Sequence, residues 1–148
     1  MGDLAGATVA IVGLGLMGGS LAAALSAARA CRRIVGVARR QSTLSMAQDL
    51  RFIEQGTPDV RRGVAEADLV ILATPVRDVL DKIAAIGPWL KPGAVLMDVG
   101  STKREVCRAM EALAAHVQPL GGHPMCGKET SGLAMADPGL YRDRVFVL

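Results

Sequence analysis

The chain reads Val9-Ala-Ile-Val-Gly-Leu-Gly-Leu-Met-Gly-Gly-Ser20 near its N-terminus. The first four residues are apolar and mostly β-branched, which predicts a short buried strand. Apolar residues then recur at helical spacing from Met17 to Ala28, so a helix is expected to start inside the glycine run. A strand, a glycine turn and a helix in this order form the beginning of an α/β fold.

The glycines of this turn have the spacing G-x-G-x-x-G and the strand–turn–helix context that a dinucleotide fingerprint requires. Gly13 permits the tight turn, Gly15 lets the backbone approach a pyrophosphate, and Gly18 lets the helix pack closely on the strand. The helix N-terminus supplies N–H donors and partial positive charge to the phosphates. The predicted cofactor-binding residues of this turn are Gly13, Gly15, Leu16, Met17 and Gly18. A glycine-rich turn without a nucleotide is the alternative.

Strands and helices are predicted to alternate along the rest of the chain. Further strands are expected at 34–37, 69–73, 94–99, 117–120 and 145–148, and helices at 42–55, 76–86 and 102–116, with a short helix within 58–67. Ser42 is expected to cap one helix, and Thr102 with Glu105 to form a capping box for another. Continuous apolar strands indicate a parallel sheet covered on both faces. We therefore expect an α/β fold of Rossmann type, with a doubly wound, mostly parallel sheet and helices on both faces. It would form one NAD(P)-binding domain over residues 1–148.

Composition excludes several classes of protein. Hydrophobic residues make up 51% of the 148 residues, which is too many for a disordered chain, yet no apolar run is long enough to span a bilayer. Aromatic residues make up only 3%, and the net charge of +3 is scattered in arginine pairs, so nucleic acid is not an expected partner. The three cysteines are far apart and show neither a C-x-x-C nor a zinc spacing. We expect no metal, no membrane and a cytoplasmic protein.

The end of the second predicted strand indicates which dinucleotide is bound. An acidic residue is expected there if the adenosine 2′-hydroxyl is to be bound, but position 38 is Ala. Arg39, Arg40 and Ser42 follow, with Thr43 beside them, and guanidinium and hydroxyl groups suit a 2′-phosphate. NADP is therefore predicted over NAD. The alternative is that both arginines are only the solvated start of the next helix.

Later strand ends are expected to meet the same site, because ligands of open α/β sheets bind outside the carboxyl ends of the strands. Thr74 and Pro75 follow one strand and are predicted to contact the cofactor. Ser101 follows another and could face the nicotinamide and the substrate, although a turn residue is a plain alternative. Lys103 is a weak candidate, since most lysines lie in solvent.

His123 lies in a loop that reads Gly121-Gly-His-Pro-Met-Cys-Gly-Lys-Glu-Thr-Ser-Gly132. A proline and several glycines around one histidine suggest that the imidazole is held in place. Beside a dinucleotide site, such a histidine suits the acid/base of a dehydrogenase. His116, the other histidine, is explained by its place near a helix end.

Four segments resemble the prephenate/arogenate dehydrogenases of tyrosine biosynthesis. They are 13–22, 68–76, 98–103 and 121–132, they occur in the family's order, and the His-Pro loop is the specific one. The resemblance implies an oxidative decarboxylation with hydride transfer to the nicotinamide. It implies that His123 takes up the proton of the substrate hydroxyl, that Ser101 supports it, and that Glu129 belongs to the polar wall near the substrate. NADP preference and arogenate use tend to go together in the family, which slightly favours arogenate over prephenate.

Departures from the family accompany this resemblance, among them Ala38 in place of the acidic residue of NAD-using members. Lys128 stands where many relatives have Thr, and Thr130 where they have Lys. Family members also carry a second, helical domain for dimerisation and substrate binding, which we expect to be absent from this chain. A homodimer is expected through that domain in a full-length protein. The alternatives are an enzyme like the 3-hydroxyacid dehydrogenases and an isolated, non-catalytic dinucleotide-binding module.

Overall fold

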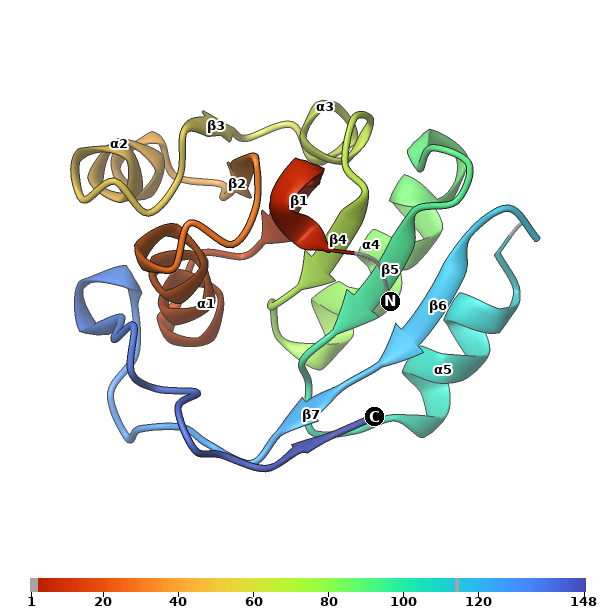
Figure 1. Ribbon diagram of the computed structural model, residues 1–148. Helices are drawn as coiled ribbons and strands as arrows, with labels where there is room; N and C mark the ends of the chain where they lie inside the picture. Colours follow the sequence, from red (N-terminus) through yellow and green to blue (C-terminus); the bar gives the residue numbers. More distant parts are fainter. Residues whose placement is uncertain (1–2, 114) are drawn as a thin grey trace.

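A parallel sheet forms the centre of the computed structural model, which describes residues 3–113 and 115–148 (Figure 1). Its strands are β1 (Thr8–Val12), β2 (Arg33–Val37), β3 (Gln55–Thr57), β4 (Leu69–Leu72), β5 (Val95–Asp98) and β6 (Gln118–Gly121). They lie in the order β3-β2-β1-β4-β5-β6, with every neighbouring pair parallel. The order reverses between β1 and β4, which is where a doubly wound sheet opens a crevice at its carboxyl edge. The predicted α/β, doubly wound fold is confirmed.

Helices connect the strands and pack on both faces of the sheet. They are α1 (Leu16–Ala27), α2 (Gln41–Asp49), α3 (Val60–Val64), α4 (Val76–Ile86) and α5 (Arg104–Glu111), with 3-10 turns η1 (Leu4–Gly6), η2 (Gly87–Trp89) and η3 (Leu133–Met135). Figure 1 shows α1 and α2 on one side of the sheet and α4 and α5 on the other. No helix in the described ranges is both long and apolar enough to cross a membrane.

Alternate residues of β1 build two separate cores. Val9 and Ile11 pack with Leu44 of α2 in one cluster, whereas Ala10 and Val12 pack in the other cluster, which contains residues of α3, α4 and α5. All four of these β1 residues are buried, because both faces of a central parallel strand are covered. This is why the strand reads as a continuous apolar run.

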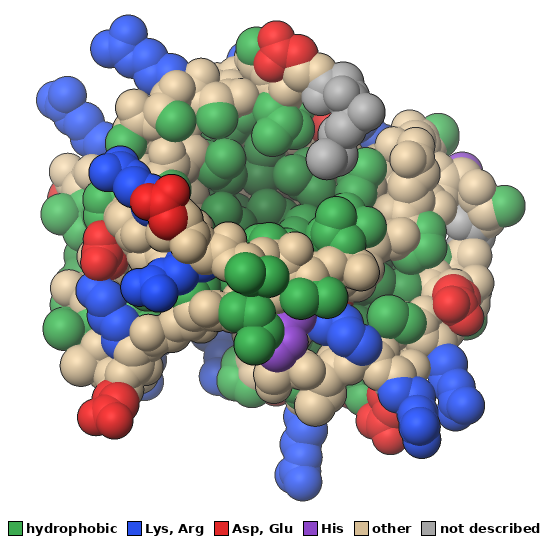
Figure 2. Space-filling view, turned by 60° about the horizontal axis from the view of Figure 1, so that its bottom comes forward, with side chains coloured by type: hydrophobic (Ala, Val, Ile, Leu, Met, Phe, Trp, Pro, Cys, Tyr) green, Lys and Arg blue, Asp and Glu red, His purple; other side chains and the backbone are tan. Residues whose placement is uncertain are grey.

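An apolar hollow of about 810 Å³ lies where β4, β5 and β6 continue the face that α1 and α2 cover. Leu69, Val95, Met97 and Leu120 line it together with Phe146. Figure 2 shows hydrophobic side chains gathered in a hollow on this side of the molecule.

The predicted limits of the second helix are wrong. α2 begins at Gln41 with Arg40 as its N-cap, so Ser42 lies inside the helix and does not cap it. The helix ends at Asp49, and Arg51 takes a left-handed backbone with φ of +58°. The chain then turns back, and Gln55 pairs with Val35 as part of β3. Strand pairing between distant segments therefore overrides the helical pattern of the sequence.

The predicted capping box of the fifth helix is also wrong. Lys103 is the N-cap of α5, and the helix has no side-chain capping hydrogen bond among the described residues. Because Lys103 is the N-cap residue, Thr102 lies one residue outside the helix, and the ammonium group of Lys103 turns inward to pair with Asp98. The helix ends at Glu111, before His116.

The C-terminal segment forms a small sheet of its own. β7 (His123–Pro124) pairs antiparallel with β8 (Phe146–Val147), and His123 lies opposite Val147. The strands predicted at 117–120 and 145–148 therefore exist, the first as β6 of the main sheet and the second as the partner of the histidine loop.

Candidate active site

Gly13 and Gly18 shape the turn between β1 and α1. Gly13 has a φ of +97°, and a Cβ there would lie 2.7 Å from Cγ2 of Thr74. A Cβ on Gly18 would lie 1.9 Å from the carbonyl oxygen of Gly13. Neither position has room for a side chain, so the close packing of helix on strand requires glycine at both.

Gly15, unlike Gly13 and Gly18, has free space where a side chain would lie. A Cβ on Gly15 would meet no described atom within 4 Å. Gly15 is the N-cap of α1, and no described side chain caps the helix, so the first N–H groups, including those of Leu16 and Met17, are available to a ligand. The helix dipole adds partial positive charge at this point. This end of α1 is suited to an anion such as a pyrophosphate.

A cavity of about 310 Å³ lies beside this turn, at the carboxyl ends of β1, β2 and β4. Its charged and hydroxyl-bearing lining residues are Arg39, Arg40, Thr43, Thr74, Asp78 and Lys82. Three cationic side chains face one carboxylate in this lining, so the cavity favours a negatively charged ligand.

The cavity brings together five of the ten residues predicted to bind a cofactor, Gly13 among them. The other four are Arg39, Arg40, Thr74 and Pro75, and their contact with a cofactor stays a prediction. Ser42 does not line the cavity, because it is exposed on α2, and the hydroxyl group next to it, that of Thr43, takes its place.

Asp78 and Lys82 of α4 line the cavity without having been predicted. Their signal in the sequence is an i, i+4 spacing in the helix that follows Thr74 and Pro75, since residues four apart share one helix face.

Thr74 provides a direct test of whether a ligand fits. Its Oγ1 atom is buried and has no hydrogen-bond partner among the described residues. Buried polar groups are nearly always hydrogen-bonded, so a bound molecule would complete this site. The open backbone at Gly15, the uncapped start of α1 and the cationic cavity make the same set of residues fit a dinucleotide.

Asp98 organises the carboxyl end of β5, which carries Ser101. The Asp98 side chain is completely buried. Its Oδ2 atom accepts a hydrogen bond of 3.0 Å from the backbone N–H of Gly100 and forms an ion pair with Lys103. Ser101 itself is exposed on the turn between these two residues.

His123 lies on the neighbouring segment. The N–H of Gly122 donates to the backbone oxygen of Asp98 at 3.1 Å, which ties the start of β7 to the end of β5. His123 is half-buried. The structure therefore places the Ser101 turn and the His123 strand on two segments joined by Asp98. Sequence reasoning gave Asp98 no role. The feature that could have indicated one is the presence of an acidic residue at the end of an apolar strand.

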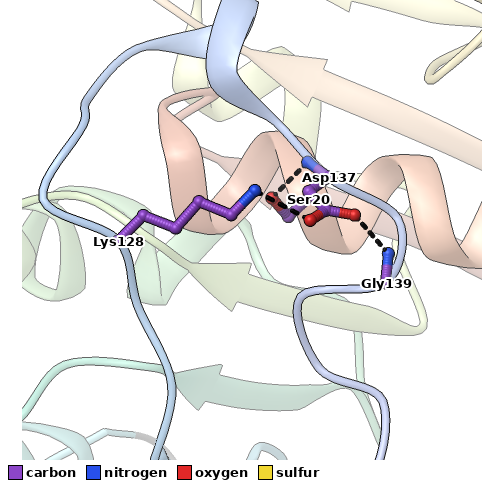
Figure 3. A network of polar contacts seen from close by, with 4 residues as sticks. All are labelled: Ser20, Lys128, Asp137 and Gly139. Carbon is purple, nitrogen blue, oxygen red and sulfur yellow. Dashed lines mark hydrogen bonds and ion pairs between the residues drawn. The ribbon is translucent and has the colours of Figure 1, made fainter.

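Glu129, the third predicted catalytic residue, is exposed in the loop after β7. Next to it, Nζ of Lys128 pairs with Oδ2 of Asp137 at 2.7 Å (Figure 3). The Asp137 N–H donates to Oγ of Ser20 on α1 at 2.9 Å. The hydrogen bond from Lys128 is the main reason that the pKa of the Asp137 carboxyl lies below its usual range. The departure at Lys128 therefore adds an exposed ion pair within this loop.

Residues 127–141, which we call the strap, lie across the N-terminal half of α1. The hydroxyl group of Tyr141 donates to the carbonyl oxygen of Met17 at 2.8 Å. Leu133 packs so closely on Gly19 that a Cβ there would lie 2.6 Å from its Cδ1. Burial raises the pKa of the Tyr141 hydroxyl. Sequence reasoning missed this residue, whose signal was that it is the only tyrosine in the chain.

The fold and the site together define a dinucleotide-binding domain of Rossmann type. The strand order, the fingerprint glycines at the switch between β1 and β4, and the cavity at the carboxyl edge are the features that define this class.

The chain belongs to the family described as prephenate dehydrogenase, nucleotide-binding domain, which it matches over residues 21–148. It is 35% identical to a prephenate dehydrogenase of Bacillus subtilis over 145 residues, covering 95% of this chain and 38% of that protein. The chain thus spans less than half the length of this curated relative.

Solved structures show the same relationship. A prephenate dehydrogenase of Aquifex aeolicus in complex with hydroxyphenyl propionate and NAD+ is 31% identical, with a TM-score of 0.86, and the match covers 98% of this chain and 51% of that one. The arogenate dehydrogenase of Synechocystis is 29% identical, with a TM-score of 0.85, and the match covers 94% of this chain and 48% of that one.

Proposed function

We propose that this chain is the cofactor-binding half of an NADP-dependent dehydrogenase that oxidatively decarboxylates arogenate or prephenate in tyrosine biosynthesis, with arogenate favoured. Family membership supports this reaction over that of the 3-hydroxyacid dehydrogenases and over a non-catalytic module. The single observation that carries the choice of cofactor is the charge of the cavity beside the glycine turn.

The residues after β2 make the cavity suitable for NADP. Ala38 stands where a carboxylate would bind the 2′-hydroxyl of NAD, and Arg39, Arg40 and Thr43 line the cavity after it. Lys82 adds a third cation from α4, opposed only by Asp78. A 2′-phosphate carries close to two negative charges, which this excess of cations would balance.

The catalytic part of the proposal assigns roles to residues at the ends of β5 and β7. A bound oxidised nicotinamide supplies the hydride acceptor. His123, as a neutral imidazole, accepts the proton of the substrate hydroxyl while the carbon that bears this hydroxyl is oxidised to a carbonyl. Loss of carbon dioxide then leaves its bonding electrons in the ring, which becomes aromatic as the carbonyl oxygen takes up a proton and becomes a phenol hydroxyl. Ser101 supports the imidazole and the hydroxyl, and Glu129 contributes to the polar wall near the substrate.

The remaining elements of the proposal concern the whole protein. We propose a cytoplasmic homodimer whose dimer contacts and further substrate groups come from a helical domain beyond these 148 residues. The 148-residue chain is then expected to bind NADP but to turn over arogenate and prephenate poorly or not at all.

Thermal unfolding with each cofactor tests the proposal. With ligand at 100 times its Kd, stabilisation is about 2.7 kcal/mol, which for a domain of this size raises Tm by about 5–10 °C. We expect such a rise with NADP+ and a smaller one with NAD+ at equal concentration. Arg39→Ser should weaken the binding of NADP+ about 10-fold or more and leave the binding of NAD+ nearly unchanged, because a charge-assisted hydrogen bond is worth about 1.5–3 kcal/mol.

Arg77→Ser is the matched control, because Arg77 is exposed on α4 and does not line the cavity. It removes the same charge and should leave both affinities unchanged. Equal shifts with the two cofactors in the unsubstituted chain would contradict the NADP assignment.

A further inference from the structure

Asp98 occupies an unusual position for a carboxylate. It ends β5 at the centre of the carboxyl edge, level with Leu72 of β4 on one side and Gly121 of β6 on the other. Its side chain is completely buried. Its Oδ1 atom has no hydrogen-bond partner in the part of the chain that the structure describes.

A buried carboxylate with one unpaired oxygen lowers the stability of a folded protein. A buried ion pair is stabilising only when its geometry is good and its remaining lone pairs are satisfied, and a packed apolar pair of similar volume often does better. The Asp98–Lys103 pair leaves one carboxylate oxygen unsatisfied. An incompletely satisfied buried carboxylate, paired with a half-buried lysine, therefore calls for an explanation other than stability.

Asp98 is bonded to both segments that carry the proposed catalytic residues, to one through its side chain and to the other through its backbone. On one side, Oδ2 of Asp98 accepts from the Gly100 N–H, and Lys103 closes the turn that contains Ser101. On the other side, the Asp98 backbone oxygen accepts from the Gly122 N–H at 3.1 Å, next to His123.

Two glycines make this second contact close. A Cβ on Gly121 would lie 3.0 Å from Sγ of Cys107, 3.4 Å from Cδ of Lys103 and 4.0 Å from Oδ1 of Asp98. A Cβ on Gly122 would lie 2.8 Å from the backbone oxygen of Asp98. The backbone that leads to His123 therefore passes close to the Asp98 backbone and near the Asp98–Lys103 pair.

We propose that Asp98 and Lys103 form a positioning pair that holds the Ser101 turn and the Gly121–His123 segment in one arrangement and so sets the orientation of the His123 imidazole. Neither residue needs to touch the substrate for this role. The inference rests on the proposed function only in the catalytic use of His123, because the contacts themselves are independent of the substrate.

NMR of the 148-residue chain tests the pair, with two observations on each variant. The first is the imidazole resonances of His123, for which His116 is an internal reference, as these are the only two histidines. The second is hydrogen exchange of the Gly122 amide, which reports whether its bond to Asp98 persists. Asp98→Asn removes the charge with little change of shape, Lys103→Met removes the ammonium group, and Lys103→Arg keeps a cation.

We expect Asp98→Asn and Lys103→Met to shift or broaden the His123 resonances and to speed Gly122 exchange about 10-fold or more, with His116 unchanged. Lys103→Arg should restore both observations to near those of the unsubstituted chain. The control is Lys91→Met, because Lys91 forms a more exposed ion pair with Asp68 at the opposite end of the sheet. It should leave His123 and Gly122 unaffected.

Unchanged His123 and Gly122 signals in both Asp98→Asn and Lys103→Met would overturn the proposal. Loss of the folded circular dichroism spectrum in both variants would overturn it as well, because the pair would then act on stability and not on position. Titration of each variant with NADP+ separates this inference from the proposed function. If the unsubstituted chain binds no dinucleotide, the proposed function fails while the NMR comparison still decides the role of the pair.

Discussion

Replacing Gly18 by Ala is the sharpest test of how this domain is packed. The new Cβ would lie 1.9 Å from the carbonyl oxygen of Gly13 and 3.1 Å from the Cβ of Ala73. The nearer partner is backbone, in a glycine that is itself closely packed against Thr74, so it cannot move aside as a flexible side chain would. Real Cβ contacts are not shorter than 3.0 Å, so the start of α1 must move away from β1 by about 1 Å.

The free-energy cost can be worked out from these contacts. Overpacking of this kind costs about 1–3 kcal/mol, and a backbone partner places Gly18→Ala at the upper end. Alanine favours a helix over glycine by up to about 1 kcal/mol, which offsets part of the loss. The expected net loss is about 2 kcal/mol, or a fall in Tm of about 4–8 °C, measured by circular dichroism and by urea unfolding.

Gly15→Ala provides the comparison that makes this test decisive. The new Cβ meets nothing within 4 Å, and Gly15 has a φ of −86°, which alanine adopts without strain. We expect a loss of stability below 1 kcal/mol, from the poorer N-cap alone, but dinucleotide binding weakened about 10-fold or more, because the methyl group stands where a phosphate would approach. If Gly18→Ala unfolds at the same temperature as the unsubstituted chain, or if Gly15→Ala is the less stable of the two, the packing argument is wrong.

Three further predictions concern the strap and the histidine. Tyr141→Phe removes the hydrogen bond to Met17 and should cost about 1 kcal/mol in urea unfolding at pH 7. Burial raises the pKa of Tyr141 above 10.0, its ordinary value, so its contribution to stability is complete below that pH and is lost as the pH rises through the folded-state pKa. Tyr141→Phe should lack this alkaline loss, and an identical alkaline profile would contradict the buried hydroxyl. Lys128→Met should raise the pKa of the Asp137 carboxyl toward 3.8, as followed by carbon NMR, and abolish a contribution to stability that is present above that pH and lost on acidification. An unchanged titration of Asp137 would show that the ion pair does not form in solution. In the full-length enzyme that we propose, His123→Asn should lower turnover about 10²–10⁴-fold while the Kd for NADP+ stays within about twofold, and normal turnover would remove His123 from the mechanism.

Local patterns in the sequence were enough to predict most of the fold. The apolar run 9–12, the fingerprint glycines and the alternation of strands with helices predict a parallel, doubly wound sheet, because each pattern depends on residues close in sequence. The predictions fail where contacts with segments distant in sequence decide where an element begins or ends. α2 ends at Asp49 and the chain turns back so that Gln55 can pair with β2, and α5 lacks its predicted capping box because its N-cap is Lys103, whose side chain pairs with Asp98.

The residues of the candidate site also divide into those that the sequence could predict and those that it could not. The sequence could predict Arg39, Arg40, Thr74 and Pro75, because the rule that ligands bind at the carboxyl ends of parallel strands brings these residues together without coordinates. It could not distinguish Ser42 from Thr43, since that choice depends on how α2 is turned about its axis.

The sequence by itself determined the class of this protein, because glycine spacing, strand patterning and the His-Pro loop are local features that its family shares. Only the tertiary structure decided how the site is held together. Asp98 joins the Ser101 turn to the segment that carries His123, and Tyr141 reaches back 124 residues to Met17 on α1. Contacts of this kind leave no periodic signal in the chain, since they depend on which surfaces the folded sheet and helices bring face to face.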